Sequence, residues 1–190
     1  LDRAELGDLG WSYRNLHFPE SPDHLHHARR RFVFDELLLM QLAILDNRRV
    51  WQSEPAHPLH ISDEDLHALV SAMFPYELTG AQQKVIADIR ADISRNVPMN
   101  RLLQGDVGSG KTAVAITAAA VAFLNVKQSA IMVPTSILAE QHFQSIGRAL
   151  AAIPFEHKPN IALLTGSTPQ SQRDAIYEGL ANGSIHVIIG

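Results

Sequence analysis

A glycine-rich loop near the middle of the chain holds the residues best suited to phosphate chemistry. The loop matches the pattern Gly-x-x-x-x-Gly-Lys-Thr, and its residues are Gly105, Asp106, Val107, Gly108, Ser109, Gly110, Lys111 and Thr112. Glycines allow the backbone to fold round a phosphate so that several N–H groups converge on it, and a helix that begins there adds its positive dipole end. The loop therefore predicts binding of a purine nucleoside triphosphate.

Two side chains of this loop are the candidate catalytic residues. Lys111 carries a mobile point charge that would reach the β- and γ-phosphates, and the Thr112 hydroxyl would bind Mg²⁺ together with the nucleotide. We therefore expect a purine nucleoside triphosphate and Mg²⁺ as cofactors, held by residues 105–112, with Thr112 as the metal contact through the nucleotide.

The segments that must position the loop alternate between strand and helix patterns. Short apolar segments predict strands at residues 102–104, 129–133, 161–164 and 185–189, and longer segments predict helices at residues 110–124, 136–152 and 170–181. Strands that alternate with helices of this length are typical of a parallel sheet with right-handed crossovers. The expected fold class is therefore α/β, with a parallel sheet flanked by helices.

The first half of the chain is expected to be mostly helical. Residues 1–23 predict an irregular segment, because they have few periodic apolar positions. Residues 24–50 form a helical pattern, and its run from residue 32 to residue 45 is apolar nearly all round, so this helix should be covered on more than one side. Residues 51–61 predict a linker, and capping-box patterns at Ser62 and Thr79 predict two further helices.

Composition limits the classes of protein to consider. Of the 190 residues, 46% are hydrophobic and 19% are charged, which allows a packed core, and the net charge of −4 argues against a uniformly basic nucleic-acid coat. The absence of cysteine excludes disulfides and thiolate metal sites. Neither a signal-peptide pattern nor an apolar run of about 20 residues occurs, so we expect a cytoplasmic location and no membrane partner.

Segments on either side of the loop indicate which class of phosphate-loop protein this is. Residues 133–141, Val-Pro-Thr-Ser-Ile-Leu-Ala-Glu-Gln, resemble motif Ia of superfamily 2 helicases, and Thr165-Gly166 follow the next strand where another motif contacts nucleic acid. This helicase resemblance implies that the nucleotide is ATP. By the same resemblance Thr135 and Gly166 would contact the nucleic-acid backbone, and Gln82 would read the adenine edge. Two simpler explanations stay open: Thr135 suits a helix cap, and Gln82 completes a capping box.

Longer stretches narrow the resemblance to one family. Residues 28–38, 74–82, 98–112 and 186–190 strongly resemble the RecG family of bacterial ATP-dependent DNA helicases. The resemblance implies a RecA-like, phosphate-loop lobe whose parallel sheet is truncated. It also implies that residues 1–55 are the end of a wedge domain with its linker helix, and that residues 56–190 are the first part of the first helicase lobe.

The same resemblance implies a biological role. It predicts a monomeric, ATP-dependent helicase whose partner is DNA, at replication forks and Holliday junctions, in DNA repair and recombination. A DNA translocase of the Mfd type shares the phosphate loop and motif Ia, and stays an alternative. A nucleotide kinase or binding module without nucleic acid is a second alternative, although motif Ia occupies the place where a kinase would have its lid.

The sequence departs from the family pattern by what it does not contain. Members of the RecG family continue with a Thr-His motif, an Asp-Glu-x-His box and a second lobe, and none of these occurs here. The run Leu42–Asp46 precedes the loop and has a helical pattern, so it is not the strand that ends in the acidic box. We therefore expect these residues to bind ATP without hydrolysing it efficiently. We also expect strand 185–189 to be an exposed edge.

Overall fold

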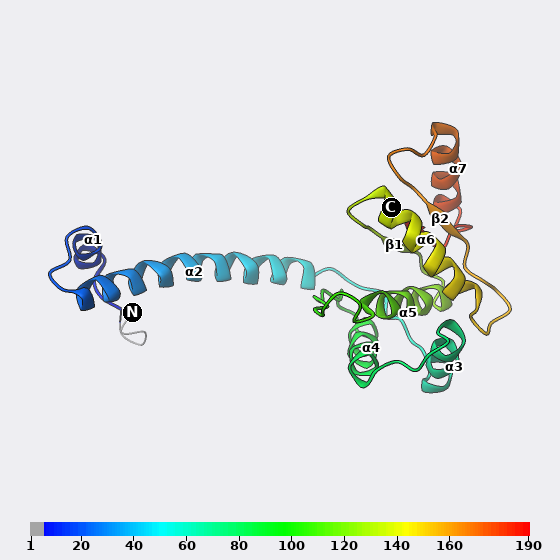
Figure 1. Ribbon diagram of the computed structural model, residues 1–190, viewed down its shortest axis with the longest axis horizontal. Helices are drawn as coiled ribbons and strands as arrows, with labels where there is room; N and C mark the ends of the chain where they lie inside the picture. The colour runs from blue at the N-terminus through cyan, green and yellow to red at the C-terminus, as the bar shows by residue number, and fades with distance from the viewer. Residues whose placement is uncertain (1–5) are drawn as a thin grey trace. The chain divides into compact units, whose positions relative to one another are not determined.

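A computed structural model describes residues 6–190, which fall into two compact units divided between Glu54 and Pro55 (Figure 1). The first unit contains helices α1 (Leu9–His17) and α2 (Pro22–Gln52). The second unit contains the remaining helices and all strands of the described chain. The phosphate loop and both motif segments therefore belong to the second unit.

Helix α1 shows that the expected irregular segment is wrong for residues 9–17, while residues 1–5 lie outside the described residues. The helix begins after Asp8, whose carboxylate accepts a hydrogen bond from the Trp11 N–H at 3.0 Å. It packs on α2, where the rings of Tyr13 and Phe32 meet edge to face with centroids 4.7 Å apart. Packing against α2 thus stabilises a helix that its own apolar pattern did not indicate.

Helix α2 confirms the predicted long helix, with Ser21 as its cap and Pro22 in its first turn. Near its start Ala28 is buried, and Arg31 donates hydrogen bonds to the Gly7 carbonyl and the Asp35 carboxylate. The expected cover on more than one side is not found among the described residues. Exposed apolar side chains run along the rest of the helix: Val33, Phe34, Leu37, Leu38, Leu39, Met40, Leu42, Ile44, Leu45 and Val50. Among the described helices, none combines the length and the apolar character needed to cross a bilayer.

The two predicted capped helices open the second unit. Helix α3 (Asp63–Met73) begins after Ser62, whose hydroxyl accepts a hydrogen bond from the Asp65 N–H at 2.9 Å. Helix α4 (Gly80–Ile93) begins with a complete capping box between Thr79 and Gln82. Both start points therefore agree with the sequence patterns.

A three-stranded parallel sheet forms the centre of the second unit, which confirms the α/β class. The strands β1 (Ser129–Ile131), β2 (Ile161–Leu163) and β3 (Val187–Ile189) lie in the order β1-β3-β2. The helices that connect and flank them are α5 (Lys111–Leu124), α6 (Ser136–Ala151) and α7 (Gln170–Ala181). Helices α5 and α6 pack on the sheet and on α3, and the core between them includes Leu69, Val114, Ile146, Leu150 and Val187.

Two expectations about strands are wrong. Residues 102–104 pair with none of the strands in the described sheet, and Leu102 is 82% exposed. An apolar run becomes a strand only where a neighbouring strand supplies the ladder hydrogen bonds. The last strand is not an exposed edge, because β3 lies between β1 and β2 and the side chains of Val187 and Ile189 are fully buried.

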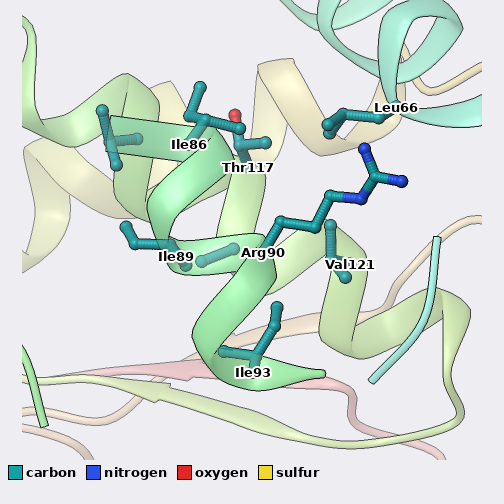
Figure 2. Close-up of a pocket in the computed structure, with 9 residues that line it drawn as sticks. Leu66, Ile86, Ile89, Arg90, Ile93, Thr117 and Val121 are labelled. Carbon is teal, nitrogen blue, oxygen red and sulfur yellow. The ribbon is translucent and has the colours of Figure 1, made fainter. Parts of the chain in front are cut away.

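A small cavity marks the interface between α4 and α5. Its lining consists of Leu66, Ile86, Ile89, Arg90, Ile93, Val114, Thr117, Ala118 and Val121 (Figure 2). Its volume is about 10 Å³, the size of one water molecule at most, and the lining is mainly apolar. Figure 2 shows Arg90 reaching toward Leu66, and its guanidinium pairs with Asp63 on α3. This region is a packing interface that holds α4 on α5.

Candidate functional site: phosphate loop and strand ends

The phosphate loop has the backbone geometry that an anion site needs. Gly108 and Gly110 adopt φ angles of 82° and 79°, a left-handed conformation that residues with a Cβ rarely adopt. Between them the Ser109 N–H donates to the Asp106 carbonyl at 3.2 Å, which closes a tight turn. Helix α5 begins directly after Gly110 and has no side-chain cap. The amino-terminal end of α5 is thus left for a ligand to satisfy, as a phosphate would.

The Lys111 ammonium lies over this turn. Its Nζ donates to the carbonyl oxygens of Gly105 at 2.7 Å and Asp106 at 2.8 Å. Phosphate oxygens carry negative charge and are stronger acceptors than neutral carbonyls, so a bound nucleotide would compete for this ammonium. Thr112 follows in the first turn of α5 and is half-buried. The residues present therefore fit a nucleotide phosphate with its Mg²⁺.

Gln82 connects the start of α4 to the phosphate loop. Its Oε1 accepts a hydrogen bond from the Thr79 N–H at 2.8 Å, and its Nε2 donates to the Ser109 carbonyl at 2.9 Å. The capping interpretation of Gln82 is therefore confirmed by the geometry. The adenine contact stays a prediction, and the second N–H of Nε2 and the second lone pair of Oε1 are the groups that Gln82 could offer to the base.

A second hollow lies at the carboxyl ends of the strands, where parallel sheets place their ligand sites. Its volume is about 330 Å³, and it is lined by Val133, Pro134, Thr135, Ser136, Ala139, Leu164, Thr165, Gly166, Arg173 and Gly190. Thr135 and Gly166, the two residues predicted to contact nucleic acid, are thus brought to one surface. Thr135 also caps α6, since its hydroxyl accepts a hydrogen bond from the Leu138 N–H at 3.3 Å.

Sequence reasoning missed Arg173, the one charged residue among those that line this hollow. Its side chain is half-buried and donates to backbone carbonyls of the loop that follows β2. The position of Arg173 in the sequence could have indicated a role beyond helix formation. Arg173 is the fourth residue of α7, near the helix end whose dipole favours an anion rather than a cation.

Comparison with known proteins identifies the family to which these sites belong. The DEAD/DEAH box helicase family matches residues 79–190, which include both the phosphate loop and the hollow at the strand ends. The chain belongs to the DEAD/DEAH box helicase family. Membership in this helicase family implies ATP binding.

Relatives within the helicases extend the similarity to the whole chain. The chain is 38% identical over 198 residues to the ATP-dependent DNA helicase RecG of Aquifex aeolicus, covering 100% of the chain and 24% of that relative. It is 42% identical over 188 residues to RecG of Bacillus subtilis, covering 98% of the chain and 27% of that relative. The chain therefore spans about a quarter of the length of these curated relatives.

A solved structure gives the same result for the fold. The structure of RecG bound to a three-way DNA junction has a TM-score of 0.85 to this chain, at 38% sequence identity. It covers 100% of the chain, and the chain covers 25% of that structure. The resemblance to RecG noted from the sequence motifs is confirmed.

Proposed function

We propose that this chain belongs to an ATP-dependent DNA helicase that acts on branched DNA, such as forks and Holliday junctions, in repair and recombination. One observation carries the proposal: a phosphate loop and a strand-end hollow occur on one parallel α/β unit that resembles RecG throughout. We further propose that residues 1–55 are the end of a wedge domain with its linker helix. The expected location is the bacterial cytoplasm.

The phosphate loop would hold Mg–ATP through residues of this chain alone. Backbone N–H groups at the start of α5 would bind the phosphates, Lys111 would pair with the β- and γ-phosphates, and Thr112 would contact Mg²⁺. When bound there, Mg²⁺ would neutralise the charge that develops on the phosphate oxygens. Gln82 would contact the adenine base. The bond from its amide to the Ser109 carbonyl supports this proposal, because it places the side chain next to the phosphate loop.

The hollow at the strand ends would hold the DNA backbone. Thr135 lies at the amino-terminal end of α6, where a helix dipole favours a phosphate, and Gly166 lines the same hollow. Neither residue can distinguish one base from another, since both would contact the backbone. The proposed contacts therefore support translocation along DNA rather than sequence-specific binding.

The complete protein that contains these residues is expected to hydrolyse ATP faster when a DNA fork is added, and to unwind that fork. Residues 1–190 alone are expected to bind ATP without turning it over, because their sequence has no Asp-Glu-x-His box and an arginine finger is typically worth about 10³–10⁵ in rate. Phosphate release with and without fork DNA measures the hydrolysis rate of the complete protein and of residues 1–190. A rate above about 1 s⁻¹ from residues 1–190 would show that the catalytic acid lies within them.

Replacing Gln82 by alanine separates its two roles. Loss of the capping box is expected to lower the free energy of unfolding by about 0.5–2 kcal/mol. If Gln82 also reads adenine, the variant should lose any preference for ATP over GTP, since a matched polar edge gives discrimination. Competition binding and thermal melts measure the two effects.

The neighbouring Gln83→Ala variant is the matched control for this test. Gln83 donates to the Leu78 carbonyl at 2.9 Å but has no bond to the phosphate loop in the described structure. It should therefore leave the ratio of ATP to GTP affinity unchanged. An unchanged ratio in Gln82→Ala as well would remove adenine recognition from Gln82 and leave it as a cap.

A further inference from the structure

The loop that follows β2 is organised around one guanidinium group. Arg173 Nε donates to the Thr168 carbonyl at 2.9 Å, and its Nη2 donates to the carbonyls of Thr165 at 2.6 Å and Gly166 at 3.2 Å. Within the loop the Thr165 N–H donates to the Thr168 hydroxyl at 2.9 Å. A hydrogen bond also joins the Thr165 and Ser167 hydroxyls. Arg173 thus bonds to both ends of a short loop.

The planar shape of the guanidinium suits this task. Its N–H groups point in fixed directions, so one side chain can hold several carbonyls in a single arrangement. A lysine ammonium is a compact point charge on a flexible stem and has no such fork. The bonds to Arg173 draw carbonyl oxygens toward the cation, and those oxygens would otherwise repel a phosphate.

The loop held by Arg173 borders the strand-end hollow. Thr165, Gly166 and Arg173 all line it, and so do Thr135 and Ser136 at the start of α6. Gly166 is exposed and has open space where a Cβ would lie. The loop would therefore meet a DNA phosphate with uncharged groups, while the Nε and Nη2 of Arg173 are engaged with the loop itself.

We propose that Arg173 is a positioning residue for DNA backbone binding, which acts by holding the Thr165–Thr168 loop against the hollow. The proposal rests on the function proposed above. Arg173 acts through the loop, so its loss should weaken DNA binding without removing a charged contact to phosphate. ATP binding at the phosphate loop should stay unchanged, because Arg173 has no contact with residues 105–112 in the described structure.

The test compares Arg173→Ala and Arg173→Lys in the complete protein with a fluorescently labelled three-way DNA junction. Ordering a loop on binding has a free-energy cost, so we expect Arg173→Ala to weaken junction binding about tenfold. Arg173→Lys should recover only part of that loss. Arg148→Ala is the matched control, because Arg148 is exposed on α6 and does not line the hollow.

Salt dependence distinguishes positioning from direct contact. Each lost contact between a cation and a phosphate lowers the slope of log affinity against log salt by about 0.7–0.9, whereas uncharged contacts leave the slope nearly unchanged. We expect the slopes of wild type and Arg173→Ala to agree. A lower slope for Arg173→Ala, or full recovery by Arg173→Lys, would overturn positioning in favour of a direct charge contact.

Hydrogen exchange tests the loop without any DNA. In the Arg173→Ala variant, the amide hydrogens of residues 165–168 should exchange at least several times faster than in wild type. The amides of β3 should stay protected, which shows that the variant is folded. Unchanged exchange in this loop would overturn the proposal. A wild-type protein that does not bind the junction would instead contradict the proposed function, with the exchange result still deciding the role of Arg173 in the loop.

Discussion

Replacing Lys111 by alanine is expected to lower the affinity for Mg–ATP by more than tenfold, about 1.4 kcal/mol or more, and to abolish DNA-stimulated hydrolysis in the complete protein. The ammonium is the one cation within the loop, and it already lies over the carbonyls of Gly105 and Asp106. Its removal deletes the charge that would pair with the phosphates. It also deletes both hydrogen bonds from the ammonium to the loop carbonyls.

Titration calorimetry with Mg–ADP and Mg–ATP measures this effect. Lys127→Ala is the matched control, because Lys127 is an exposed lysine that follows the other end of α5 and should leave both affinities unchanged. DNA binding without nucleotide should be the same in all three proteins, since Lys111 does not line the strand-end hollow. Equal affinity of wild type and Lys111→Ala for nucleotide would remove Lys111 from the phosphate site.

Local chemistry explains what could be predicted from the sequence. A helix cap needs one side chain and a backbone N–H two or three residues further along, so Ser62, Thr79 and Thr135 were recognisable from sequence alone. Each of them caps its helix in the structure. The parallel sheet was also predictable, because strands that alternate with helices leave few other arrangements.

The errors concern features that depend on distant partners. Residues 102–104 have the apolar character of a strand but no neighbour to pair with in the described sheet, and 185–189 were expected at an edge although β3 lies centrally. Strand order is a property of the whole sheet, so position along the chain does not determine it. Helix α1 was missed for the same reason, because Ser12 and Asn15 are buried by packing against α2 rather than by an apolar stripe.

The site shows the same limit. The residues of the phosphate loop are contiguous, and their spacing alone predicted a glycine-rich turn followed by a helix. The bond from Gln82 to Ser109 joins residues 27 apart in sequence, and no local pattern indicates it. Arg173 lies on the following helix and donates hydrogen bonds to the carbonyls of Thr165 and Gly166. Its role therefore depends on how that helix packs against the loop.

Gly110→Ala is expected to weaken nucleotide binding about 100-fold, from two separate causes. A residue with a Cβ in the left-handed region costs roughly 1–2 kcal/mol, about 5–30-fold in affinity if the free loop relaxes and must be restrained again on binding. In addition, a Cβ at Gly110 would overlap the amide nitrogen of Gln82. Gln82 would have to move and give up its bond to Ser109.

Two other glycines separate these causes. Gly108 has the same left-handed backbone, with φ of 82°, but open space where a Cβ would lie, so Gly108→Ala tests the backbone cost alone. Gly80 in the first turn of α4 has open space and no positive φ, so Gly80→Ala should leave nucleotide affinity unchanged. The expected order of loss is therefore Gly110→Ala, then Gly108→Ala, then Gly80→Ala.

The overlap with Gln82 can be isolated by a double-mutant cycle. Removing the Gln82 side chain leaves nothing for the new methyl group to displace, so Gly110→Ala should cost less in the Gln82→Ala background than in wild type. The remaining loss should match that of Gly108→Ala, because only the backbone conformation still opposes the methyl group. Calorimetry on the four proteins of the cycle gives the coupling between the two positions. Purely additive losses would mean that Gln82 does not lie against Gly110 when nucleotide binds, and that its bond to Ser109 belongs to the nucleotide-free loop.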